Sequence, residues 1–99
     1  MSSYGFHPDA SNEFTASIDY YADINPRLAE EFISEVEHSI SVICRNPERW
    51  RVVDGDVRRC LVHRFPYGLY YTFANKFVTI WAVMHLSREP GYWKPRKGA

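Results

Sequence analysis

The segment RRCLVHRFPYGLYYTF, residues 58–73, combines positive charge with the residue types of a buried strand. Four of its first seven residues carry or can carry positive charge: Arg58, Arg59, His63 and Arg64. Arginine binds phosphates and carboxylates through a planar fork of donors, and histidine can exchange a proton near neutral pH. The segment therefore predicts contact with an anionic ligand or with acidic side chains.

A second group of side chains that could take part in catalysis follows residue 84: His85, Arg88 and Tyr92. His85 could act as base or acid, and Tyr92 could stack on a ligand or donate a proton. Arginines from both groups could hold a phosphate while the proton moves. The combined candidates for metal-independent cleavage of a phosphodiester are Arg58, Arg64, His85, Arg88 and Tyr92.

Each of these residues also has a purely structural interpretation. Arg58 and Arg59 could pair with acids of neighbouring elements. His85 is equally consistent with a hydrogen-bonded histidine at a strand end. Trp93 could anchor a partner or cover the end of the chain.

Composition limits the class of protein. The 99 residues, 45% of them hydrophobic, predict one globular domain over residues 1–99, with a core at about 3–93 and a basic tail at 94–99. Cys44 and Cys60 are too few for a disulfide framework and are expected to be buried thiols. The four histidines are scattered, so no metal site or cofactor is expected. Without a signal peptide or a long apolar run, the expected location is the cytoplasm, away from membranes.

The formal net charge of zero hides two oppositely charged halves. Residues 1–50 hold nine acids and three bases, a balance of −6, and residues 51–99 hold the reverse, a balance of +6. The first half is therefore expected to present an acidic surface and the second half a basic one.

The first half predicts a short strand followed by two helices. Residues 3–7 are aromatic and end before Pro8, which suits the first turn of a helix. Asn25 and Pro26 form an N-cap and first-turn pair, and apolar residues then keep helical spacing as far as Asn46–Pro47. So short a break between helices predicts an antiparallel hairpin.

The second half changes to the period of a strand. Residues 57–64, 67–74 and 77–85 predict an antiparallel three-stranded meander, which residues 3–7 should join at an edge or beside the last strand. One face of that last strand is wholly apolar and is expected to cover the helices: Val78, Ile80, Ala82 and Met84. The predicted fold class is α+β, with an N-terminal strand and an antiparallel two-helix hairpin packed on an antiparallel sheet that the meander completes.

This order of elements, together with four stretches of sequence, resembles the RelE/ParE superfamily of toxins from type II toxin–antitoxin modules. The stretches are EFTASIDYYADINPRLAEEFISEVEHSISVI, NPERWRVV, VRRCLVHRFPYGLYYTF and AVMHLSREPGYW, and the resemblance spans residues 6–93. It implies a small cytosolic toxin that is silenced by a cognate antitoxin through an acidic or amphipathic segment.

Two activities occur within this superfamily: RelE-like members cleave messenger RNA on the ribosome, and ParE-like members inhibit DNA gyrase. RelE-like nucleases place lysines ahead of the second strand, where this chain has Glu48, Arg49 and Arg51. Arginine is a poor proton shuttle. Another nuclease branch ends in a His–Tyr pair, whereas this chain ends Lys97–Gly98–Ala99. A ribosome binder is also expected to be basic, and this chain is neutral.

These differences favour the ParE-like, plasmid-stabilisation branch: a gyrase inhibitor that is not an enzyme. The residues expected to contact its target are Arg58, Arg59, Arg64, His85, Arg88 and Trp93. The alternative is a ribosome-dependent mRNA endoribonuclease that uses the five candidate residues above. A third hypothesis is a toxin-fold protein that only binds its partner.

Overall fold

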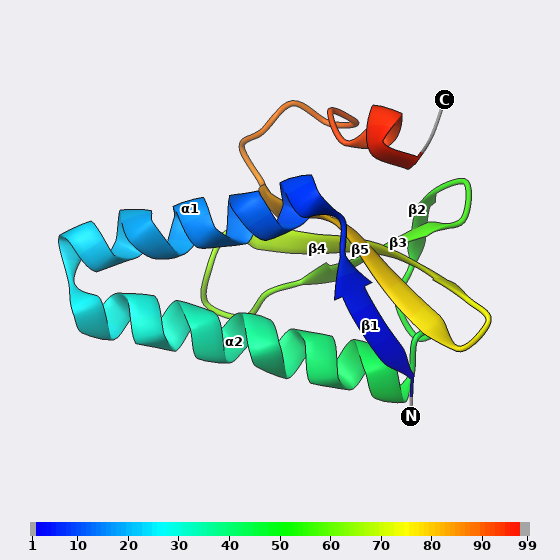
Figure 1. Ribbon diagram of the computed structural model, residues 1–99, viewed down its shortest axis with the longest axis horizontal. Helices are drawn as coiled ribbons and strands as arrows, with labels where there is room; N and C mark the ends of the chain where they lie inside the picture. Colours follow the sequence, from blue (N-terminus) through cyan, green and yellow to red (C-terminus); the bar gives the residue numbers. More distant parts are fainter. Residues whose placement is uncertain (1, 98–99) are drawn as a thin grey trace.

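The computed structural model describes residues 2–97 and arranges them as a helical layer on a five-stranded sheet (Figure 1). The elements are β1 Ser3–Phe6, α1 Pro8–Ile24, α2 Pro26–Arg45, β2 Val52–Asp54, β3 Val57–Leu61, β4 Tyr67–Ala74, β5 Phe77–His85 and the 3-10 turn η1 Lys94–Lys97. The predicted α+β class is confirmed. Neither helix is long and apolar enough to cross a membrane, within the part of the chain that is described.

The helical hairpin begins and ends where its capping residues predict. The Nδ1 of His7 accepts a hydrogen bond from the Asp9 amide at 3.1 Å, at the start of α1. Asn25 Oδ1 accepts from the Arg27 amide at 2.9 Å and starts α2, with Pro26 in the first turn. Asn46 ends α2, and its amide bonds the carbonyls of the last turn. The hairpin and its boundaries are confirmed.

The sheet has the strand order β1-β5-β4-β3-β2. The meander β3–β4–β5 is antiparallel as predicted, and β1 lies at an edge beside β5. Two features differ from the expectation. The β1–β5 pairing is parallel, so the sheet is mixed, and the short strand β2 adds a fifth member. Strand β2 escaped prediction because its three residues are all exposed and show no alternation.

A β-bulge changes which residues of β5 face the helices. Tyr70 pairs with Ala82 but Tyr71 pairs with Ile80, so β5 carries one extra residue, Trp81. Beyond the bulge the two faces exchange, and Val83 joins the core beneath the helices. The prediction of one continuous apolar face on β5 is wrong, since Ala82 and Met84 lie in a separate cluster on the opposite face.

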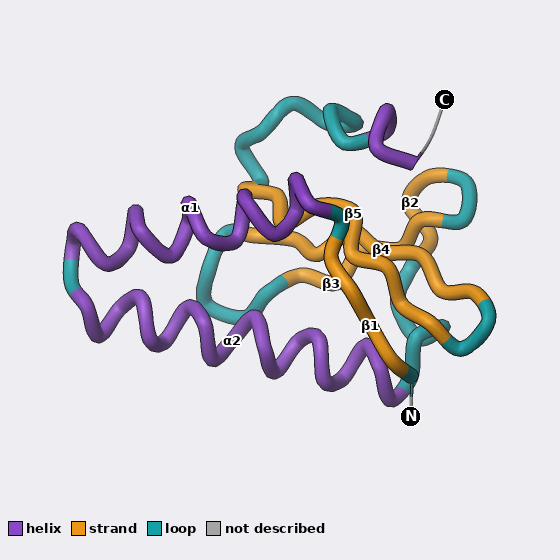
Figure 2. Tube along the Cα trace, viewed as in Figure 1, coloured by secondary structure: helices purple, strands orange, loops and turns teal. Residues whose placement is uncertain are grey.

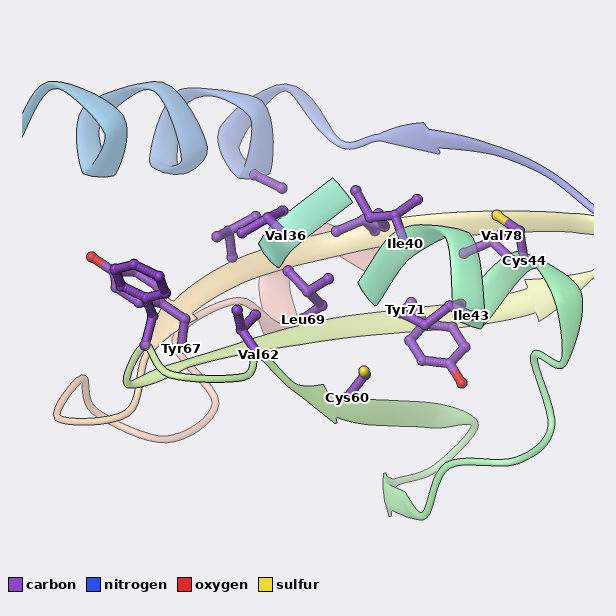
Figure 3. Packing of buried hydrophobic residues seen from close by; sticks show 14 of the residues in the cluster. Val36, Ile40, Ile43, Cys44, Cys60, Val62, Tyr67, Leu69, Tyr71 and Val78 are labelled. Atoms are coloured by element: carbon purple, nitrogen blue, oxygen red, sulfur yellow. The ribbon is translucent and has the colours of Figure 1, made fainter. Parts of the chain in front are cut away.

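The main core lies between the helices and the sheet. In Figure 3, Val36, Ile40 and Ile43 of α2 lie against the sheet residues Leu69 and Tyr71. The Tyr71 hydroxyl donates to the Pro47 carbonyl at 2.6 Å, which ties the loop after α2 to the middle of the sheet. Burial raises the pKa of Tyr71 to about 12.

Both cysteines lie in this core as free thiols, as the sequence predicts (Figure 3). Burial raises the pKa of Cys60 to about 11, and it also raises the pKa of Cys44. High pKa values keep both groups as unreactive thiols at neutral pH.

The opposite face of the sheet carries a second, smaller core. Val57, Tyr70, Ala82 and Met84 pack there against Trp93 from the segment that follows β5. Figure 2 shows this segment, residues 86–97, as a loop that ends in the short turn η1. We call it the tail. Residues 94–99 were expected to be a basic tail outside the core; of these, residues 94–97 fold back beside the sheet, and Gly98 and Ala99 lie outside the described residues.

Candidate functional site

The tail is fixed by one carboxylate of the first helix, Glu13. Arg96 donates two hydrogen bonds to it, from Nη1 to Oε1 at 3.0 Å and from Nη2 to Oε2 at 2.9 Å. The Tyr92 hydroxyl donates to Oε2, and the amide of Val83 donates to Oε1 at 3.1 Å. Glu13, Tyr92 and Arg96 therefore join α1, β5 and the tail, and we call them the tail anchor.

The tail anchor is largely withdrawn from water, which strengthens its interactions. The side chains of Arg96 and Glu13 are only 13% and 15% exposed. Arg96 also donates to the Trp81 carbonyl at 2.9 Å and lies 3.6 Å from Asp9. Hydrogen bonding to Glu13 raises the pKa of Arg96. Burial, reinforced by the Glu13 charge, raises the pKa of Tyr92, so this hydroxyl keeps its proton at neutral pH.

Three of the predicted site residues lie close together at this end of β5: His85, Arg88 and Tyr92. Of these, Tyr92 also belongs to the tail anchor. The Arg88 guanidinium lies 3.9 Å from the centroid of the Tyr92 ring. His85 and Arg88 line a small pocket of about 150 Å³ next to Glu13. The Nδ1 of His85 accepts from the Ser87 amide at 3.1 Å, which leaves Nε2 as the ring nitrogen available to a ligand. We call these three residues the β5 corner.

The arginines Arg58 and Arg64 do not join this corner. Arg58 points to the helical side of the sheet with Cys60, and its Nη1 donates to the carbonyls of Trp50 at 2.7 Å and Glu48 at 3.1 Å. Arg64 lies beyond the end of β3 with φ 72° and pairs with Glu31 of α2 at 2.8 Å. The predicted strand 57–64 is therefore too long, because the chain turns after Leu61 to bring Arg64 to the helix.

Arg59 lies on the opposite face, across from Tyr70 and beside Val57 of the second core. It lines a pocket of about 220 Å³ beneath the tail. Trp93 lies in the same region but is only 3% exposed, with its ring 5.7 Å from that of Tyr70. Its packing there holds the tail on the sheet, and its role in contact with a target stays a prediction.

This distribution restricts the chemistry that the five catalytic candidates can perform. Phosphate capture by several arginines needs their guanidinium groups to converge. Instead, the Arg58 guanidinium donates hydrogen bonds to backbone carbonyls, and the Arg64 guanidinium pairs with Glu31. The Tyr92 hydroxyl donates its hydrogen bond to Glu13. Within residues 2–97, no three His, Cys, Asp or Glu side chains are placed to hold a metal ion.

Sequence reasoning missed Glu13 and Arg96, which organise this region. The spacing of Glu13 offered one signal, since it lies three residues from Ala10 and four from Ser17, on the inner side of α1, where a carboxylate needs a partner. Arg96 offered none, because basic residues near a chain end are ordinarily solvated.

Two comparisons with known proteins bear on the family and the fold of this chain. The family model described as the ParE toxin of the type II toxin–antitoxin system parDE matches residues 4–90. A solved chain described as the chromosomal ParDE TA system from P. aeruginosa has the same fold, with a TM-score of 0.75 and 19% identity over 88% of this chain and 98% of that one. A search of curated proteins gave no match. Since the family model spans most of its length, this chain belongs to the ParE toxin family of type II toxin–antitoxin systems.

Proposed function

We propose that this chain is a toxin that a cognate antitoxin neutralises and that acts by inhibiting DNA gyrase. Membership of the ParE family supports the toxin role. The observation that favours gyrase over RNA cleavage is the separation of the catalytic candidates. Arg58 and Arg64 are bound to other parts of the chain, away from the β5 corner. An inhibitor that acts by binding needs no convergent catalytic set.

Four cationic or titratable side chains that remain at least partly accessible are the proposed contacts with the target. Arg88 is exposed at the β5 corner, and His85 is partly exposed beside it. Arg59 is half-buried on the same side of the sheet as the tail, and Arg64 is half-exposed beyond β3. Gyrase and ribosomes are both cytosolic in bacteria, so the cytosol is the proposed place of action under either hypothesis.

One observation keeps the nuclease as the second candidate. His85, Arg88 and Tyr92 do meet in the β5 corner, and a histidine beside an arginine is a plausible phosphodiester site. However, the Tyr92 hydroxyl is already bound to Glu13, and its raised pKa makes it a weak acid at neutral pH. A nuclease would therefore depend on His85 and Arg88 alone.

The test is to induce the chain in bacteria and follow growth, plasmid topology and messenger RNA together. A gyrase inhibitor should arrest growth and relax a reporter plasmid while messages stay intact. Cleaved messages with normal supercoiling would support the nuclease instead. Normal growth would support a toxin-fold protein that only binds its partner.

The antitoxin proposal has a separate test. The protein encoded by the adjacent gene, co-expressed with this chain, should co-purify with it and restore growth. Failure to bind at micromolar concentration would contradict neutralisation by that protein.

A further inference from the structure

The pocket beneath the tail contains a cation with no partner of its own. Arg59 lines this pocket of about 220 Å³, and the stem of its side chain lies over Gly68, 3.4 Å from where a Cβ on that glycine would be. Within residues 2–97, the Arg59 guanidinium makes no hydrogen bond within 3.5 Å and no ion pair within 4.0 Å. The guanidinium groups of Arg58, Arg64 and Arg96 all have partners.

An unpaired guanidinium at the mouth of a pocket favours an incoming anion. It offers five donors in a planar fork that matches a carboxylate, and the packing of its stem over Gly68 limits the freedom that binding would remove. The one carboxylate among the lining residues, Asp54, already pairs with Lys94 at 2.8 Å. The pocket therefore keeps a net positive charge.

The rest of the pocket is apolar and aromatic. Tyr70 and Met84 of the sheet and Trp93 of the tail contribute to its lining. Pockets for free small molecules usually measure about 300–1,000 Å³, so this one is better suited to a side chain or two that project from a peptide. A carboxylate next to an apolar residue has the complementary chemistry.

We propose that this pocket binds an acidic side chain, with an apolar neighbour, from an extended segment of a partner protein. The carboxylate pairs with Arg59, and the apolar neighbour packs against Tyr70, Met84 and Trp93. The identification of that partner as the antitoxin rests on the proposed function. Because the tail forms one wall of the pocket, binding there also holds the tail on the sheet.

The proposal can be tested with a peptide probe. An acetylated and amidated peptide, Gly-Phe-Glu-Glu-Leu-Gly, is titrated into the isotopically labelled chain at low salt, beside the same peptide with both Glu replaced by Gln. The acidic peptide should shift the NMR signals of the Arg59 Nε and the Trp93 indole and bind about tenfold more tightly than the neutral one.

Two charge-removing variants make the test specific. Arg59→Gln should weaken binding of the acidic peptide about tenfold, whereas the matched Arg51→Gln change, at an exposed arginine just before β2, should alter it less than about twofold. Arg59→Lys, which keeps the charge and loses the fork, should fall between them. Unchanged spectra elsewhere in each variant verify the fold.

Equal losses in Arg59→Gln and Arg51→Gln would overturn the proposal, because they would indicate general charge attraction. Equal affinity for the acidic and neutral peptides would overturn it as well, as would an absence of shifts at Arg59 and Trp93. None of these measurements uses toxicity or gyrase. A failure here is therefore distinguishable from a failure of the proposed function.

Discussion

Glu13 illustrates how a single, largely covered carboxylate can position the tail. It accepts hydrogen bonds from the amide of Val83 in β5, and from the Tyr92 hydroxyl and the Arg96 guanidinium in the tail. The unfolded chain does not bring these donors together, so their number and burial make Glu13 a stability determinant. The exposed tail pairs Lys94–Asp54 and Lys97–Asp56 are expected to contribute much less.

The first prediction concerns this carboxylate. Glu13→Gln should lower the free energy of unfolding by roughly 2–4 kcal/mol, because it removes the carboxylate that makes two hydrogen bonds to the poorly hydrated Arg96 charge. Urea unfolding measures the change. Glu30→Gln, the same change at an exposed position of α2, should stay within about 0.5 kcal/mol. Similar losses in both variants would contradict the special role of Glu13.

The second prediction concerns the Cys60 thiol. Its pKa is raised to about 11 from an ordinary 9.0, so above pH 9 the unfolded chain loses this proton while the folded chain keeps it. The unfolded state then binds fewer protons, and stability falls as the pH rises toward 11. As the pH rises from about 8 to 11, the free energy of unfolding should fall less for Cys60→Ala than for the unaltered chain, by on the order of 1–2 kcal/mol. Urea unfolding at each pH measures both values. If they fell equally with pH, the loss of stability would not come from the Cys60 thiol.

The third prediction concerns Arg88. Arg88→Ala should weaken growth arrest by about fivefold or more in effective dose, since it removes an exposed proposed contact worth about 1 kcal/mol. Loss of its contact with Tyr92 should cost no more than about 1 kcal/mol of stability. Arg27→Ala on the exposed side of α2 is the control and should remain fully toxic. Equal toxicity of the two variants would remove Arg88 from the contact surface.

At the scale of elements, local chemistry predicted the helices and turns well. Asn25 with Pro26 marks the start of α2, and the short linkers of the meander set its antiparallel pairing. The bulge at Trp81 was missed because residues 81–84 are all apolar, so the sequence shows no alternation there that would reveal a change of face. The partners of Arg58 and Arg64 were equally inaccessible, since they come from the loop after α2 and from α2 itself and depend on where β3 ends.

The β4–β5 turn provides the fourth prediction. Asn75 and Lys76 both have positive φ, 53° and 61°, as a two-residue type I′ hairpin turn requires. Lysine is strained in this conformation and glycine is not, so Lys76→Gly should stabilise the chain by about 0.5–1 kcal/mol in urea unfolding. Lys76→Ala keeps the β-carbon and should give no gain. An equal gain in both variants would assign the effect to charge.

At the scale of the whole molecule, the two oppositely charged halves are partly joined by ion pairs. Arg96 pairs with Glu13 and Asp9, and Arg64 pairs with Glu31, so part of the +6 of the second half neutralises the −6 of the first. Of the cations in the segment 58–64, Arg58 and Arg64 lie toward the helices, whereas Arg59 faces away from them. Arg59 and Arg88 are left as cations near the tail that a partner can contact.

We propose that this member of the ParE family inhibits gyrase by binding and does not cleave RNA. The most direct measurement is a supercoiling assay with purified gyrase, relaxed plasmid and increasing amounts of the purified chain. We predict that supercoiling falls as the concentration of the chain rises, and that Arg88→Ala shifts this dependence to higher concentration. Full supercoiling at concentrations of the chain that cause codon-specific cleavage of message on programmed ribosomes would contradict the claim.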